Sequence, residues 1–155
     1  SAAIAIHLAE RYGGRQTLIP VAGTDDRARH DELCFFVMTE LDAPLYITRR
    51  HQGLSEIYGA SHVAVESAKA YFLRSADEME RRLEDGRPFL LGDDFTVADI
   101  LLQSCLFWSK TLGLTLCRSV ESYSTRLAAR PAYLSAMKTN FTPAAMAALQ
   151  GQPAE

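Results

Sequence analysis

The chain has 155 residues, of which 48% are hydrophobic and 23% are charged, and its formal net charge is −3. This composition is typical of one globular domain and excludes intrinsic disorder. A negative charge without a long basic run disfavours nucleic-acid binding, and no apolar run approaches the roughly 20 residues that span a bilayer. Three widely spaced cysteines and four histidines show no disulfide or metal-ligand spacing. We therefore expect a soluble, cytoplasmic protein that binds neither nucleic acid, membrane nor metal.

The first predicted helix covers residues 2–12 and ends at Gly13-Gly14, because glycine readily adopts the left-handed conformation that follows many helices. Ile4, Leu8 and Tyr12 recur every four residues on this helix and form an apolar stripe. Residues 14–23 contain Pro20 and are predicted to be a connector.

A long helix is predicted over residues 24–51, with Thr24 or Asp25 as its N-cap. Pro44 is expected to kink or split it. The helix is apolar on two sides, so both sides must be buried. One side carries Leu33, Phe36, Val37 and Leu41, and the other carries Cys34, Phe35, Met38 and Leu45. The second side could line a hydrophobic cleft, or it could pack against another domain or a second subunit.

Further helices are predicted at 61–84, 96–111, 120–129 and 131–137. The second of these is apolar almost all round, so it should be the central helix. Almost no segment alternates with the period of two that marks strands. The sequence therefore predicts an all-α fold, a helical bundle of five to six helices.

The start of the central helix has a specific local pattern. Thr96 is its predicted N-cap, with a hydroxyl that can accept the N–H of Asp99, while the Asp99 carboxylate accepts the N–H of Thr96. Phe95 and Ile100 occupy the positions of the matching hydrophobic staple. We favour this structural capping role for Asp99 over an acid–base role.

These residues resemble a known family. The run FLLGDDFTVADILL, preceded by MERRLEDGRP, looks like the C-terminal helical domain of cytosolic glutathione transferases. RLAARPAYLSAM is similar to that family's closing segment, and SAAIAIHLAERYG resembles the last helix of its thioredoxin-like N-terminal domain. The resemblance implies that residues 1–13 are that last helix, 14–23 a linker, 24–140 the helical domain and 141–155 a C-terminal tail.

The resemblance also implies a function. The parent protein would use glutathione as co-substrate and conjugate its thiolate to a small hydrophobic electrophile in detoxification, and it would form a homodimer. The thioredoxin-like domain, missing from this chain, would supply the catalytic Tyr, Ser or Cys, so we expect no catalytic residue here and an inactive fragment. Ser1 matches the serine that contacts the γ-glutamyl carboxylate of glutathione.

The candidates for the electrophile site are Cys34, Phe35, Met38 and Trp108, although Trp108 could instead pack in the core. Two alternatives to a transferase stay open. One is a non-catalytic protein-interaction module with the same helical fold, as occurs in translation factors and tRNA synthetases. The other is a glutathione-dependent reductase or isomerase, which only the catalytic residue would distinguish from a transferase.

Overall fold

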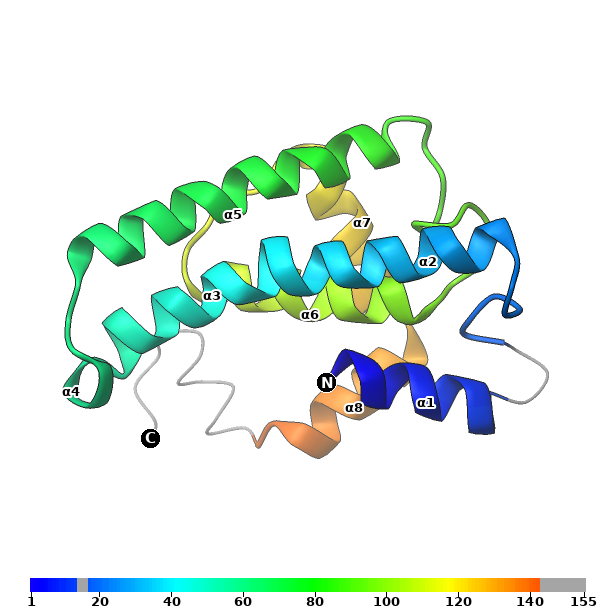
Figure 1. The fold of residues 1–155 in the computed structure, drawn as a ribbon, viewed down its shortest axis with the longest axis horizontal. Coiled ribbons are helices and arrows are strands. Elements are labelled where there is room, and N and C mark those ends of the chain that lie inside the picture. The colour runs from blue at the N-terminus through cyan, green and yellow to red at the C-terminus, as the bar shows by residue number, and fades with distance from the viewer. Residues whose placement is uncertain (14–16, 143–155) are drawn as a thin grey trace.

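The computed structural model describes residues 1–13 and 17–142, and within them the chain is helical (Figure 1). Outside the helices, two isolated antiparallel bridges, Phe89 with Gly92 and Leu91 with Asp94, shape one turn, and no strand occurs in the described residues. The all-α fold is therefore confirmed. None of the helices in the described part of the chain is both long and apolar enough to cross a membrane.

Helix α1 (Ala2–Tyr12) lies at one side of the bundle and packs against α6 (Val97–Thr111). Its one buried residue is Ala9. The predicted stripe faces outward instead, since Ile4, Leu8 and Tyr12 are 66%, 50% and 70% exposed. The helix ends at Gly13, which has a right-handed φ of −61°, and Gly14 lies outside the described residues.

The connector is fastened to the bundle beyond that point. The carbonyl of Leu18 accepts the backbone N–H of Val97 at 2.9 Å, and Ile19 is buried. The second bundle helix then starts at Thr24, whose hydroxyl accepts the N–H of Arg27 at 3.2 Å.

Residues 25–53 form one continuous helical stretch made of α2 (Asp25–Phe36), η1 (Val37–Asp42), α3 (Ala43–Thr48) and η2 (Arg49–Gly53). The η segments are π-helical, with wider turns. Pro44 neither splits nor ends the helix. A proline has no N–H to donate and crowds the carbonyl four residues earlier. The widened turn just before it, in which the Ala43 N–H bonds the Met38 carbonyl, accommodates the proline.

The remaining helices are α4 (Ser55–Tyr58), α5 (His62–Leu83), α6, α7 (Arg118–Ala128) and α8 (Pro131–Asn140). All except the short α4 match predicted helices within a few residues. α3 packs along α5, and α6 lies between η1 and α7. The core forms around α6, which buries side chains on several sides, including Val97, Leu102 and Leu106. This is the central position that its apolar circumference predicted.

Candidate functional site

The start of α6 is held by a buried carboxylate. Asp99 is fully buried and accepts four hydrogen bonds: from the Thr96 N–H (2.8 Å) and hydroxyl (3.0 Å), the Leu90 N–H (2.9 Å) and the Tyr123 hydroxyl (2.6 Å). Thr96 and Asp99 form a capping box. Burial and the neighbouring Asp99 charge raise the pKa of Tyr123. Because its oxygens are fully used, Asp99 joins α6, the preceding turn and α7 rather than acting on a substrate.

The two staple residues meet at a cavity. Phe95 makes an edge contact with Phe89, with ring centroids 5.4 Å apart, and the Arg130 guanidinium carbon lies 3.5 Å from its ring centroid. Ile100 is 41% exposed, and it lines the same cavity as Phe95.

Cys34 is buried in the core with 3% of its surface exposed, and its sulfur lies 3.6 Å from Nε2 of His30. Burial, followed by the charge of Asp31, raises the pKa of the thiol to about 12. The thiol is therefore protonated at neutral pH and does not reach a surface cleft. Its neighbour Phe35 points outward and is 72% exposed. The long helix thus does not present these two side chains on one surface.

Met38 and Trp108 are both half-buried, on η1 and α6, which pack against each other. The ring of Tyr46, on α3, meets Trp108 edge-on, with centroids 4.9 Å apart and planes at 88°. The aromatic pair leaves Tyr46 partly exposed at 43%. Met38, Tyr46 and Trp108 therefore provide apolar surface on three elements that pack on one another.

A carboxylate lies on the same elements. Asp42, the last residue of η1, is half-buried, and its Oδ1 lies 4.0 Å from the sulfur of Cys105 on α6. Burial raises the pKa of Asp42, while the positive amino end of Ser1 opposes that shift. Ser1 itself is exposed, and its carbonyl begins α1 by accepting the Ala5 N–H at 3.0 Å.

Sequence reasoning did not single out Asp42 or Tyr46. The sequence did contain a signal for Asp42. It is an acidic residue among apolar neighbours, two positions before Pro44 in a predicted helix. Tyr46 carried no local signal, because its role depends on the ring of Trp108 on a distant helix.

A separate cavity of about 640 Å³ lies between α6 and α8 and has mainly apolar walls. Phe95, Ile100 and Phe107 are on one side, and Tyr133 and Met137 of α8 are on the other. Gln103 of α6 also lines it, although it is only 4% exposed. Its side-chain carbonyl oxygen is the one buried side-chain polar atom without a hydrogen-bond partner in the described residues.

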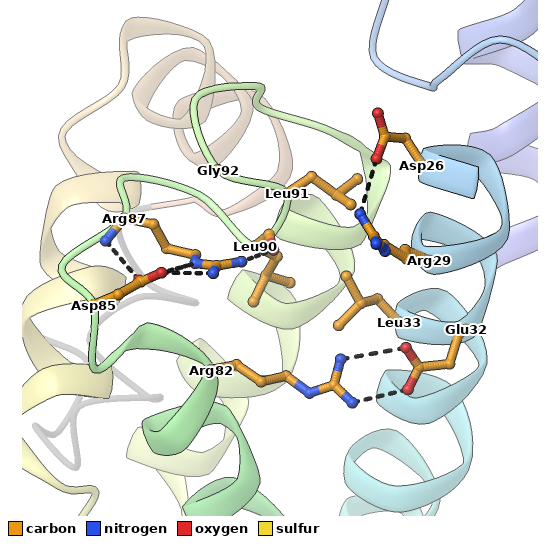
Figure 2. Close-up of a pocket in the computed structure, with 10 residues that line it drawn as sticks. All are labelled: Asp26, Arg29, Glu32, Leu33, Arg82, Asp85, Arg87, Leu90, Leu91 and Gly92. Carbon is orange, nitrogen blue, oxygen red and sulfur yellow. Dashed lines mark hydrogen bonds and ion pairs between the residues drawn. The ribbon is translucent and has the colours of Figure 1, made fainter. Parts of the chain in front are cut away.

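A charged groove of about 420 Å³ lies between α2, the end of α5 and the turn that follows it (Figure 2). Its three arginines are each paired with a carboxylate: Arg82 with Glu32 (2.8 Å), Arg87 with Asp85 (2.6 Å) and Arg29 with Asp26 (3.3 Å). The Arg87 hydrogen bonds lower the pKa of Asp85 to about 2. The groove is therefore neutralised by its own side chains, which makes it a poor site for an anion. No group of three or more potential metal ligands was found in the part of the chain described.

Residues 62–135 match the family model described as glutathione S-transferase, C-terminal domain. Among solved structures, a glutathione transferase from Methylococcus capsulatus strain Bath shares 31% identity and a TM-score of 0.74, with 89% of this chain and 65% of that one covered. BphK, a bacterial GST solved as a ternary complex, shares 26% identity and a TM-score of 0.78, with 90% and 66% covered. A beta-class enzyme from Sphingomonas chungbukensis, at 24% identity and a TM-score of 0.76, has the same fold. No curated protein gives a significant sequence match.

These findings agree with the resemblance carried by the capping segment. Over residues 62–135 the chain matches the C-terminal domain of the glutathione S-transferase family, and its fold is the one that these transferase structures share. It spans about 65% of the length of the solved structures that it matches.

Proposed function

We propose that this chain is the second-substrate-binding, helical part of a glutathione transferase-like enzyme that conjugates the glutathione thiolate to a small hydrophobic electrophile. The observation that supports the proposal is the aromatic contact of Tyr46 on α3 with Trp108 on α6, beside η1, which carries the half-buried Met38 and Asp42. Apolar walls with a few polar groups are typical of small-molecule sites. An electrophile held there would lie near the start of α1.

Glutathione would bind at that start. In the proposed complex, the first turn of α1 offers backbone N–H groups to the γ-glutamyl carboxylate, an arrangement that suits an anion at a helix N-terminus. Ser1 would add its hydroxyl to this contact. Two proteins that share this fold were solved with glutathione or a glutathione conjugate bound.

The thiolate would have to be activated by another part of the protein. Burial raises the thiol pKa of Cys34 and of Cys105, so neither is a nucleophile at neutral pH. We assign activation to a thioredoxin-like unit that precedes Ser1. The outward stripe of Ile4, Leu8 and Tyr12 supports such a unit, because an apolar helix face needs a partner to cover it. We place the enzyme in the cytoplasm as a homodimer, as the family resemblance implies.

The test uses the longer protein that includes the residues ahead of Ser1. Tyr46→Ala should raise KM for an apolar electrophile about tenfold, because removing a large ring from a binding surface costs about 1–2 kcal/mol, and KM for glutathione should change less than about twofold. Ile57→Ala, which truncates another strongly exposed apolar side chain on α4, is the matched control and should change neither constant.

Equal increases in both KM values would indicate general damage and count against the assignment. An unchanged KM for a panel of apolar electrophiles would remove Tyr46 from the site. Turnover of glutathione disulfides without any conjugation would favour the reductase alternative over the transferase.

A further inference from the structure

The carboxylate of Asp42 is half-buried beside α6, and no arginine, lysine or histidine of the described residues forms an ion pair with it. The amino end of Ser1 lowers its pKa but does not pair with it either. Its hydrogen-bonding neighbour is the thiol of Cys105, at 4.0 Å, and a thiol is a weak donor. Partial burial of a carboxylate without a strong partner opposes folding. Residues that break the rules of packing in this way are expected at functional positions.

The position of Asp42 relates it to the aromatic pair. Asp42 and Tyr46 are four residues apart on the long helix, and Cys105 and Trp108 are three residues apart on α6. Residues at these spacings are neighbours on one face of a helix. The carboxylate–thiol contact and the contact between the two rings therefore lie next to each other, where the long helix packs on α6 (Figure 1). A molecule on the aromatic rings would have the carboxylate one helical turn away.

We propose that Asp42 determines the charge class of the second substrate, by accepting a hydrogen bond from a positively charged N–H group, such as a protonated amine, on the hydrophobic electrophile. The proposal rests on the proposed function for the existence of this substrate site. The rings of Tyr46 and Trp108 take the apolar part of the molecule, and its ammonium group lies about 5–6 Å away, the spacing of neighbouring side chains on a helix face. A site that pairs with a polar group rejects an analogue without that group, because the site's own polar atom is left unpaired.

Glutathione also carries an ammonium group, on its γ-glutamyl end, so the same chemistry has two sources. The contact next to Asp42 favours the electrophile, because the aromatic rings suit an apolar body and the γ-glutamyl end of glutathione has none. The two sources predict different kinetic constants for a variant without the charge. An ammonium group of the electrophile makes Asp42 matter for the KM of that electrophile, and an ammonium group of glutathione makes it matter for the KM of glutathione.

The first experiment measures binding without any reaction. Trp108 is the single tryptophan of the chain, so quenching of its fluorescence by a nitroaromatic compound reports binding at this surface. The two probes are unreactive dinitrobenzamides of equal size, one with an N-aminoethyl group, which carries the charge, and one with an uncharged N-propyl group. At pH 7 the 155-residue chain should bind the aminoethyl compound about tenfold more tightly, the low end for a hydrogen bond to a charged group because the carboxylate is partly solvated.

Asp42→Asn should reduce this difference in affinity to less than about twofold, because it keeps the size of the side chain and removes its charge. Glu40→Gln is the matched control. Glu40 lies two positions earlier on η1 and accepts a hydrogen bond from Tyr71 of α5 instead. The control removes one negative charge from the same helix, so it should keep the tenfold preference. Loss of the preference in both variants would assign it to the overall charge of the helix and overturn the proposal.

The second experiment uses the corresponding chlorodinitrobenzamides as electrophiles, with the longer protein that begins ahead of Ser1. Asp42→Asn should raise KM for the aminoethyl electrophile about tenfold, and it should change KM for the propyl electrophile and for glutathione less than about twofold. The kcat values should stay the same, since the ammonium group takes no part in the reaction and is held equally throughout. A variant damaged in its fold would instead change all of these constants together.

Two further results would overturn the proposal. Equal affinity of the unmodified chain for the aminoethyl and propyl compounds would show that the carboxylate does not select a charge. A rise in KM for glutathione alone would assign Asp42 to the ammonium group of glutathione. Failure of the proposed function is distinguishable, because a longer protein that conjugates neither electrophile contradicts that function while the preference in binding stands. Conjugation of both electrophiles with equal KM contradicts only the assignment of Asp42.

Discussion

Asp99 stabilises the start of α6 and has no carboxylate oxygen left to act on a substrate. Its two oxygens accept hydrogen bonds from Leu90, Thr96 and Tyr123, which lie on the turn before α6, at its cap and on α7. The sequence predicted the bond to Thr96, because the spacing of three residues is local. It could not predict those to Leu90 and Tyr123, since these depend on how the turn and α7 pack.

Asp99→Ala should strongly destabilise the chain, because it leaves several buried donors without an acceptor. We expect a loss of about 3 kcal/mol or more in the free energy of unfolding, measured by urea titration. Tyr123→Phe removes one of those donors and should cost about 1 kcal/mol. A loss below about 1 kcal/mol for Asp99→Ala would show that the network does not support the fold.

Asp42, in contrast to Asp99, is a half-buried carboxylate whose charged form is disfavoured by burial. Burial raises its pKa above the ordinary value of 3.8, so the folded chain favours the protonated form. A group of this kind stabilises the fold fully at pH values below its pKa in the unfolded chain. That stabilisation is lost as the pH rises through its pKa in the folded chain. The Cys105 thiol on α6 lies against it, with its sulfur 4.0 Å from Oδ1 of Asp42.

Asp42→Asn should therefore stabilise the 155-residue chain at pH 7, seen as a higher midpoint in urea unfolding. The gain in the free energy of unfolding should be less than about 1 kcal/mol, because the side chain is partly solvated. The gain should shrink towards pH 3.5, where the carboxyl is increasingly protonated. Asp93→Asn, on an exposed loop, is the control and should show no such trend. Destabilisation by Asp42→Asn at neutral pH would mean that the charge is needed for folding.

Among the elements, the long helix 25–53 shows where local sequence reasoning is limited. Its N-cap at Thr24 and its apolar faces follow from residue type and spacing. The π-helical segments η1 and η2 do not, because hydrophobic spacing indicates a helix but not a widened turn, such as the one in η1 that accommodates Pro44. η1 ends at Asp42 and contains Met38, so the unpredicted geometry is the part that shapes the candidate site.

Helix α1 is predicted to be separable from the bundle, because its one buried residue is Ala9 and Ile4, Leu8 and Tyr12 face outward, while only Ile6 among its larger apolar residues packs against the core. It also makes an ion pair of Glu10 with Arg27 at 2.8 Å, in which the arginine side chain is 18% exposed and the carboxylate side chain 46%. Removing residues 1–13 should cost about 1–3 kcal/mol and leave one cooperative unfolding transition, followed by circular dichroism. Loss of cooperativity or of most helical signal would contradict the boundary between residues 1–13 and 24–140.

Across the whole molecule, the order of the helices and the central position of α6 were predictable from hydrophobic spacing and stop signals. The residues of the proposed electrophile site were predictable only in part. Met38 and Trp108 lie on packed elements near Tyr46, whereas Cys34 is buried and Phe35 faces solvent. When a helix is apolar on two sides, the neighbouring elements decide which side chains become buried. Those neighbours are distant in the sequence, so the local pattern does not identify them.

We propose that the chain binds and orients a substrate while another unit of the protein activates glutathione. The most direct measurement is the rate of glutathione conjugation to an apolar aryl electrophile, compared between the 155 residues and the longer protein that begins ahead of Ser1. We expect no rate above the uncatalysed reaction for the 155 residues and clear catalysis by the longer protein. Conjugation by the 155 residues alone, or a well-folded longer protein without any, would contradict it.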